Sequence, residues 1–219
     1  MSSSHMSSQF LRGLRSPRLY LAIAGIAVLL AMRPVKAAAD AEVYVQSIID
    51  QGFKLLDQGG PAAHNPKFHT FVLQHVDAEK TALFALGQYR RGASEAVLKP
   101  YVEAFRDYAT TNYEMRLEER KAQKLKVTGS RIAKPGDVTV EAETAPEGAA
   151  KPVKIAFRLA GEKGDYKVVD VQAAGAWLSI EQRDQFTAFL SKHNGDIAAL
   201  PAHLMEQTKK MRAGSAKGN

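Results

Sequence analysis

Histidine and carboxylate side chains are the first candidates for chemistry in this chain, because they can bind metals or transfer protons. Three histidines, His64, His69 and His75, follow one another at spacings of five and six residues. At most two of them can share one face of a helix, and no glutamate stands at the spacing of an HExxH metal site. We therefore expect structural or surface roles for them, and neither a metal nor another cofactor.

Asp170 is the carboxylate with a possible catalytic role. It interrupts the apolar run Val168-Val169-Asp170-Val171, and a carboxylate beside an apolar cavity can act as a general base. The alternation of a strand instead predicts that Val169 and Val171 point inward while Asp170 lies on the outer, solvated face. The sequence has no cysteine, no G-x-S-x-G motif and no phosphate-binding glycine loop. We expect a protein that is not an enzyme; an enzyme for an apolar substrate is the distant alternative.

The first forty residues resemble an export signal. Residues 1–5 are typical of an expression-vector scar, and three arginines follow within residues 12–18. The apolar run Leu19–Met32 is too short to span a bilayer comfortably, and the small residues Ala37–Ala39 suit signal peptidase. We expect residues 1–39 to be a scar plus a cleaved signal peptide, and the mature protein to be exported. A retained membrane anchor is the alternative.

Removal of the signal changes the charge of the protein. Residues 1–37 carry five basic and no acidic side chains, so the formal net charge falls from +7 to +2. Basicity that belongs to a targeting segment does not indicate nucleic-acid binding. We expect no nucleic-acid partner and a monomeric protein.

The hydrophobic spacing of the mature chain changes once along its length. Spacings of three and four residues predict helices near 41–58, 67–76, 77–89 and 100–121. Alternation then predicts four strands within residues 125–171, and two helices between 179 and 211 close the chain. Four strands with short connections form an antiparallel sheet, whose apolar face the helices must cover. The prediction is one α+β domain over residues 40–211, followed by a flexible tail at 212–219.

The expected helix at 100–121 carries an aromatic stripe. Tyr101, Phe105 and Tyr108 fall on one face, where such large side chains can fill a core or wall a cavity. Asn112 lies within the same stripe. It is either a core amide bonded to neighbouring backbone or a polar contact inside a cavity. Pro100 predicts that the helix starts or bends there.

Three blocks of sequence, in this order and spacing, resemble the MlaC family, also known as the toluene-tolerance auxiliary proteins. They are Ala85–Tyr89, which is similar to the family's Ala-Leu-Gly-Arg-Tyr pattern, Ala104–Tyr108, and Val168–Val171. The likeness extends over Ala41–Met211, with Gln88 replacing a basic residue.

The resemblance implies a periplasmic lipid carrier without catalytic activity. Family members hold phospholipid acyl chains between a twisted sheet and the helices, with the head group toward solvent. They pass lipid between an inner-membrane ABC transporter complex with an MCE protein and an outer-membrane lipoprotein–porin complex. A related branch, HpnM, is associated with hopanoids and an RND-type transporter, so a carrier of hopanoid or other polycyclic lipids is the alternative.

The expected wall of the lipid cavity combines the aromatic stripe with the inward-facing strand residues. These residues are Tyr101, Phe105, Tyr108, Asn112, Leu125, Val127, Val138, Val140, Ile155, Phe157, Val169 and Val171.

Overall fold

The computed structural model describes residues 17–58, 65–118, 124–144 and 151–215. The chain divides into two compact units, residues 1–36 and residues 37–219. The predicted scar at residues 1–5 and His64 lie outside the described residues, and signal cleavage stays a prediction. None of the described helices combines the length and the apolar character that a membrane span requires. The fold described below is that of the second unit.

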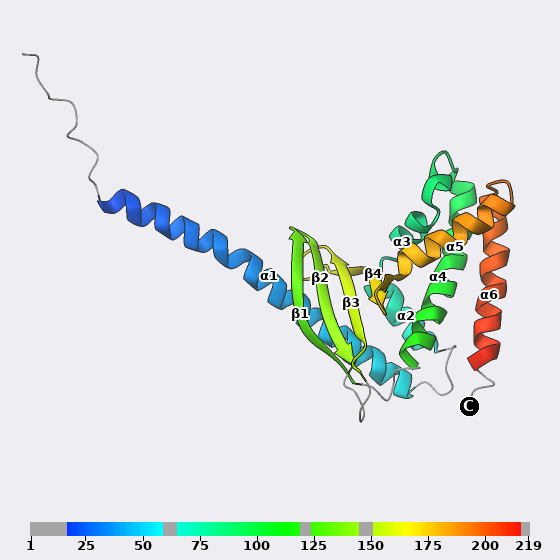
Figure 1. Cartoon of the computed structure of the whole chain (residues 1–219), viewed down its shortest axis with the longest axis horizontal. Helices are drawn as coiled ribbons and strands as arrows, with labels where there is room; N and C mark the ends of the chain where they lie inside the picture. The colour runs from blue at the N-terminus through cyan, green and yellow to red at the C-terminus, as the bar shows by residue number, and fades with distance from the viewer. Residues whose placement is uncertain (1–16, 59–64, 119–123, 145–150, 216–219) are drawn as a thin grey trace, which may run out of the picture. The chain divides into compact units, whose positions relative to one another are not determined.

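Helices and strands follow the order that Figure 1 shows, helices first, then a strand meander, then helices. The elements are α1 (Pro17–Gln58), α2 (Pro66–His75), α3 (Ala78–Ala85), η1 (Gly87–Arg90), α4 (Glu95–Glu118), β1 (Leu125–Lys134), β2 (Asp137–Thr144), β3 (Lys154–Ala160), β4 (Lys167–Ala173), β5 (Ala176–Trp177), α5 (Leu178–Lys192), η2 (Ile197–Ala199) and α6 (Leu200–Ser215).

The strands form one antiparallel sheet in the order β1-β2-β3-β4-β5. Each strand pairs with its neighbour in the sequence, which short turns allow. The register is irregular in β4: Arg158 pairs with Asp170, and Leu159 pairs with Val168. Val169 is therefore the extra residue of a β-bulge, and the alternation of β4 is broken at this point.

The C-terminal part of α1 packs across the sheet. Ala41, Val45 and Ile49 are buried in one cluster with Val140 of β2 and Leu159 of β3. The side chain of Gln46 also covers the free edge of β1, because its amide donates to the Leu125 carbonyl and accepts from the Val127 amide. An unpaired strand edge can pair with a strand of another molecule. Helix α1 therefore blocks such pairing as well as burying the apolar face of the sheet.

A second core lies among helices α3 to α6. Tyr101 and Phe105 of α4 are fully buried, and the ring of Phe186 from α5 stands edge-on to both, with centroids 6.3 and 6.1 Å away. The Tyr101 hydroxyl donates to the Ala82 carbonyl at 2.8 Å. Leu204 of α6 closes this cluster, and α4 and α6 run side by side in Figure 1.

The predicted α+β class is confirmed, with three differences in the elements. Helix α6 runs to Ser215 and so includes the first residues of the expected tail at 212–219. The sheet has a fifth strand, β5, which is only two residues long and therefore shows no alternation in the sequence. Helix α4 does not start at Pro100, which was one of the two expectations: it starts at Glu95 and contains Pro100. The Ser94 carbonyl accepts from the amides of Val97 and Leu98, so the first turn forms before the proline is reached.

Candidate functional site

An apolar cavity lies between the sheet and helices α1, α2 and α4. It encloses about 150 Å³. Its described lining is Ile48, Ile49, Gly52 and Phe53 of α1; Phe68, Phe71, Val72 and His75 of α2 with Val76 after it; Tyr113, Arg116 and Leu117 of α4; Leu125, Thr144, Ile155, Phe157, Val168, Val171 and Ala173 of the strands; and Leu178 of α5.

The volume sets what the cavity can hold in this state. A cavity of about 150 Å³ lined by Leu, Ile and Phe stays dry and admits one benzene molecule. Pockets for larger ligands enclose roughly 300–1,000 Å³. The cavity therefore holds a short stretch of hydrocarbon as it stands, and it must widen to take a longer one.

Four side chains bring polar atoms to the described cavity wall: His75, Tyr113, Arg116 and Thr144. Burial lowers the pKa of His75 below its ordinary value, and the charge of Lys167 lowers it further. The imidazole is therefore neutral at physiological pH. Burial likewise raises the pKa of the Tyr113 hydroxyl far above its usual range. Arg116 is thus the only charged group of the described wall near neutral pH.

His75 is hydrogen-bonded to Tyr44, which is not among the described lining residues of the cavity. The Tyr44 hydroxyl donates to the Tyr166 carbonyl at 2.9 Å and lies 3.0 Å from His75 Nδ1. A hydroxyl has one proton, so His75 Nδ1 is the donor in the second bond. Burial raises the pKa of Tyr44 to about 12, which keeps this hydroxyl protonated.

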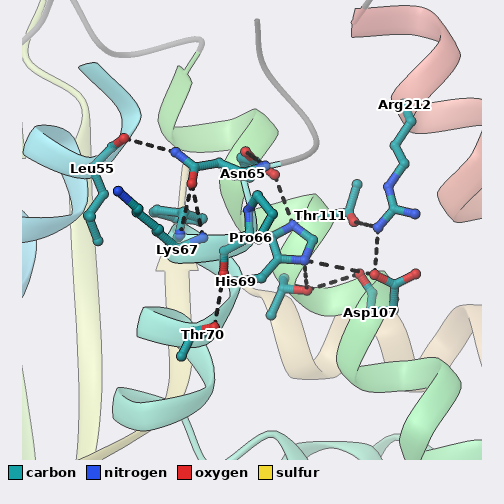
Figure 2. A network of polar contacts seen from close by, with 12 residues as sticks. Leu55, Asn65, Pro66, Lys67, His69, Thr70, Asp107, Thr111 and Arg212 are labelled. Atoms are coloured by element: carbon teal, nitrogen blue, oxygen red, sulfur yellow. Dashed lines mark hydrogen bonds and ion pairs between the residues drawn. The ribbon is translucent and has the colours of Figure 1, made fainter. Parts of the chain in front are cut away.

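A polar network holds α2, which forms one wall of the cavity, against α4. The carboxylate of Glu114, 1% exposed, accepts from the Asn65 amide and from His69 Nε2, both at 2.9 Å. Asn65 also caps the first turn of α2 through its side chain. Figure 2 shows the continuation of this network from His69 through Asp107 to Arg212 of α6.

The buried carboxylate differs from the expectation for α4. The helical pattern places Glu114 on the polar face of this helix, opposite the aromatic stripe. In the structure α2 covers that face, so the carboxylate is buried but bonded. Buried charges persist in proteins where they are paired and hydrogen-bonded, as here.

Four of the residues expected in the lipid site line this cavity. They are Leu125, Ile155, Phe157 and Val171. Their contact with lipid stays a prediction.

Four other expected residues lie on α4, away from the cavity lining. Tyr101, Phe105 and Tyr108 belong to the core of helices α3 to α6 instead. Asn112 accepts a hydrogen bond from Arg116 Nε at 2.7 Å, and its own nitrogen lies 3.9 Å from the sulfur of Met211 on α6. The stripe of α4 is buried as expected, but other helices bury it, because α4 turns a different face to the sheet.

The remaining expected residues belong to the sheet, but α1 or the bulge keeps them from the cavity. Val138 and Val140 are buried under α1, and Val127 packs at the edge of the same cluster. Val169 points into a separate hollow, together with Asp170. The bulge explains this last difference, because it turns Val168 rather than Val169 toward the side of Val171.

Asp170 has a structural partner. It is 9% exposed rather than solvated, which corrects the expectation of an outer, open position. Its carboxylate accepts from the Ser179 amide at 3.1 Å and from the Ser179 hydroxyl at 2.5 Å. Ser179 lies in the first turn of α5, where amides lack partners within the helix. Asp170 therefore fastens the start of α5 to β4 and is absent from the cavity lining.

The wall residues of α1 and α2 are the part of the site that sequence reasoning missed. Phe53 of α1 and Phe68, Phe71 and His75 of α2 recur at helical spacing. That pattern shows that these faces are buried, without showing that they border a void. Tyr113 and Arg116 carry no such signal, because one extends the aromatic stripe and the other looks like a surface cation.

The fold and the cavity together define a class: an α+β protein with an apolar cavity between its sheet and helices, lined by few polar groups. The family model described as "MlaC protein" matches residues 43–206, and the chain belongs to this family. A solved structure from Ralstonia solanacearum, a phospholipid-binding protein in complex with a phospholipid, shares the fold. Its TM-score is 0.64 at 22% identity, over 80% of this chain and 98% of that chain. No curated protein sequence shows a significant match to this chain.

Proposed function

We propose that this protein is a periplasmic carrier that binds the acyl chains of a phospholipid in the cavity between α1, α2, α4 and the sheet. It passes the lipid between an inner-membrane MCE–ABC transporter complex and an outer-membrane lipoprotein–porin complex. The observation that carries the proposal is the apolar cavity itself, in a chain of the MlaC family. The similar protein from Ralstonia solanacearum is in complex with a phospholipid, which supports the same ligand class here.

The energetics favour this use of the cavity. Each methylene transferred from water to an apolar environment contributes about 0.8 kcal/mol. Acyl chains therefore drive their own entry without a chemical step. The Asp170 carboxylate, the candidate general base, is hydrogen-bonded to Ser179, so the proposal gives this protein no catalytic role.

A pair of tryptophan variants tests the cavity. Val171 lines it, whereas Val169, two residues earlier on the same strand, lines the separate hollow. We expect Val171→Trp to fill the cavity and to lower the amount of co-purified lipid severalfold. Val169→Trp, the matched control, should retain wild-type lipid. Native mass spectrometry of the detergent-free proteins, followed by lipid analysis of the extracts, measures both.

The outcomes separate the alternatives. Diacyl phospholipid in the wild type and its loss in Val171→Trp alone support the proposal. Hopanoid in the extract would replace the proposed ligand with a polycyclic one. Equal lipid in both folded variants would remove the cavity from the mechanism, and a wild type that takes up no added lipid would overturn the carrier function.

A further inference from the structure

Arg116 is exceptional on the wall of an otherwise apolar cavity. It belongs to the last turn of α4, and it is the only charged side chain of the described lining near neutral pH. Its side chain is 45% exposed, so it lies at the boundary between cavity and solvent. A cation at this boundary does not stabilise bound hydrocarbon. It can instead bind an anionic group that a ligand carries next to its acyl chains.

The guanidinium is oriented but only weakly neutralised. Its Nε donates to the Asn112 side chain at 2.7 Å, which fixes the plane of the group. It also forms an ion pair with Glu181 at 3.7 Å, in which both side chains are about half exposed. Exposed pairs of this kind contribute little to stability, so an incoming anion can displace Glu181 at small cost. The planar fork of arginine suits phosphate or carboxylate oxygens.

Tyr113 supplies a second donor beside Arg116. It lies three residues earlier on α4, and it also lines the cavity. Burial, and secondarily the charge of Asp170, raises the pKa of this hydroxyl and keeps it protonated, while the nearby charge of Arg116 lowers that pKa. The described part of the chain gives the Tyr113 hydroxyl no hydrogen-bond partner, although tyrosine hydroxyls in such positions usually have one. A ligand oxygen at the mouth of the cavity would satisfy it.

We propose that Arg116 and Tyr113 form an anion-binding subsite that holds the negatively charged group of the bound amphiphile while its chains enter the cavity. This inference rests on the proposed carrier function. The shared chemistry is an oxyanion, which is the phosphodiester of a phospholipid or the carboxylate of a free fatty acid. A neutral polycyclic lipid offers no such group, so the subsite favours anionic amphiphiles over hopanoids.

Lipids that differ only in the anionic group test the subsite. The purified, delipidated protein is equilibrated with dispersed dioleoyl phosphatidylglycerol, dioleoylglycerol or oleate, and bound lipid is measured by native mass spectrometry. Arg116→Gln should weaken binding of the phosphatidylglycerol by roughly tenfold, the loss expected for one charge-assisted hydrogen bond. Binding of the uncharged dioleoylglycerol should not change. Arg116→Lys should restore part of the loss, and the exposed Arg91→Gln should match the wild type.

Each outcome decides the proposal. A loss confined to phosphatidylglycerol supports the subsite with a phosphodiester as its ligand, and a loss confined to oleate supports it with a carboxylate. Equal loss for dioleoylglycerol would show that Arg116 acts through packing and would overturn the subsite. A wild type that binds phosphatidylglycerol and dioleoylglycerol equally would overturn it too, while leaving the carrier function intact. A wild type that binds none of the three lipids would overturn both.

Discussion

His75 and Asp170 show how single titratable residues serve the structure. The Asp170 carboxylate accepts hydrogen bonds from Ser179 at the start of α5. His75 is hydrogen-bonded to Tyr44 and also lines the cavity. Both residues therefore have structural contacts that explain their positions without a catalytic role. The cavity wall is best served by a neutral imidazole, because a charge in an apolar site loses its hydration.

The lowered pKa of His75 gives a stability effect with a definite sign. Burial, and secondarily Lys167, lowers the pKa of the folded state below the unfolded value of about 6.5. Below pH 6.5 the unfolded chain binds more protons, so stability falls as the pH drops from 6.5 toward the lower folded pKa. Between pH 7.5 and 5.5 the wild type should lose more unfolding free energy than His75→Gln. Urea unfolding at both pH values measures this difference, and parallel losses in the two proteins would contradict it.

Helix α2 is the element on which the cavity most depends. It contributes Phe68, Phe71 and Val72 to the wall, yet it is only ten residues long. Isolated helices of this length are marginal in water, so tertiary contacts must hold it. The side chain of Asn65 caps its start, and Glu114 ties that start to α4.

Removal of the Glu114 carboxylate should therefore release α2. Glu114→Ala removes the acceptor of the Asn65 amide and of His69 Nε2, and a buried donor left unsatisfied costs about 1–3 kcal/mol. We expect the loss in chemical unfolding, together with weaker lipid retention. Glu103→Ala, on an exposed part of the same helix, is the matched control and should change stability by less than about 1 kcal/mol. Similar losses in the two variants would show that the network does not anchor α2.

At the scale of the whole molecule, the described part of the second unit has two large cores, a smaller cluster of Leu56, Phe68 and Val72, and an apolar cavity. Helices α3 to α6 form one core, and α1 with the sheet forms the other. The cavity opens between the sheet and the helices that border it, and it is smaller than a usual ligand pocket. A ligand that widens the cavity also fills it, so the loaded protein gains apolar contacts that the empty one lacks.

Lipid loading should therefore stabilise the protein as a whole. A ligand that binds only the folded state raises the free energy of unfolding by about 2.7 kcal/mol at one hundred times its Kd. We expect the delipidated protein to unfold at a lower temperature than the lipid-loaded protein, and added phospholipid to restore the difference. Differential scanning calorimetry of loaded and stripped samples checks this. Identical midpoints would argue against a buried ligand, and Val171→Trp should show a smaller shift than Val169→Trp.

The sequence alone determined the elements and their class. Periodicities of 3.6 and 2 predicted the helices and the four main strands, because side chains that face the interior must be apolar along the whole element. Strand residues near one edge of the cavity, such as Leu125 and Ile155, were also expected in the site. The short strand β5 escaped prediction, since two residues show no period.

Only the tertiary structure decided which buried face meets which partner. Periodicity shows that a face is covered, and it does not distinguish a packed core from a void. The pattern of α4 therefore predicted Tyr101 and Phe105 as cavity residues, whereas in the structure they pack against α5 and α6. The bulge at Val169 likewise exchanged two neighbouring valines between opposite sides of β4, because one extra residue reverses the alternation. Arg116 lies beside the cavity because α4 packs next to α2 and the sheet, which its sequence pattern does not reveal.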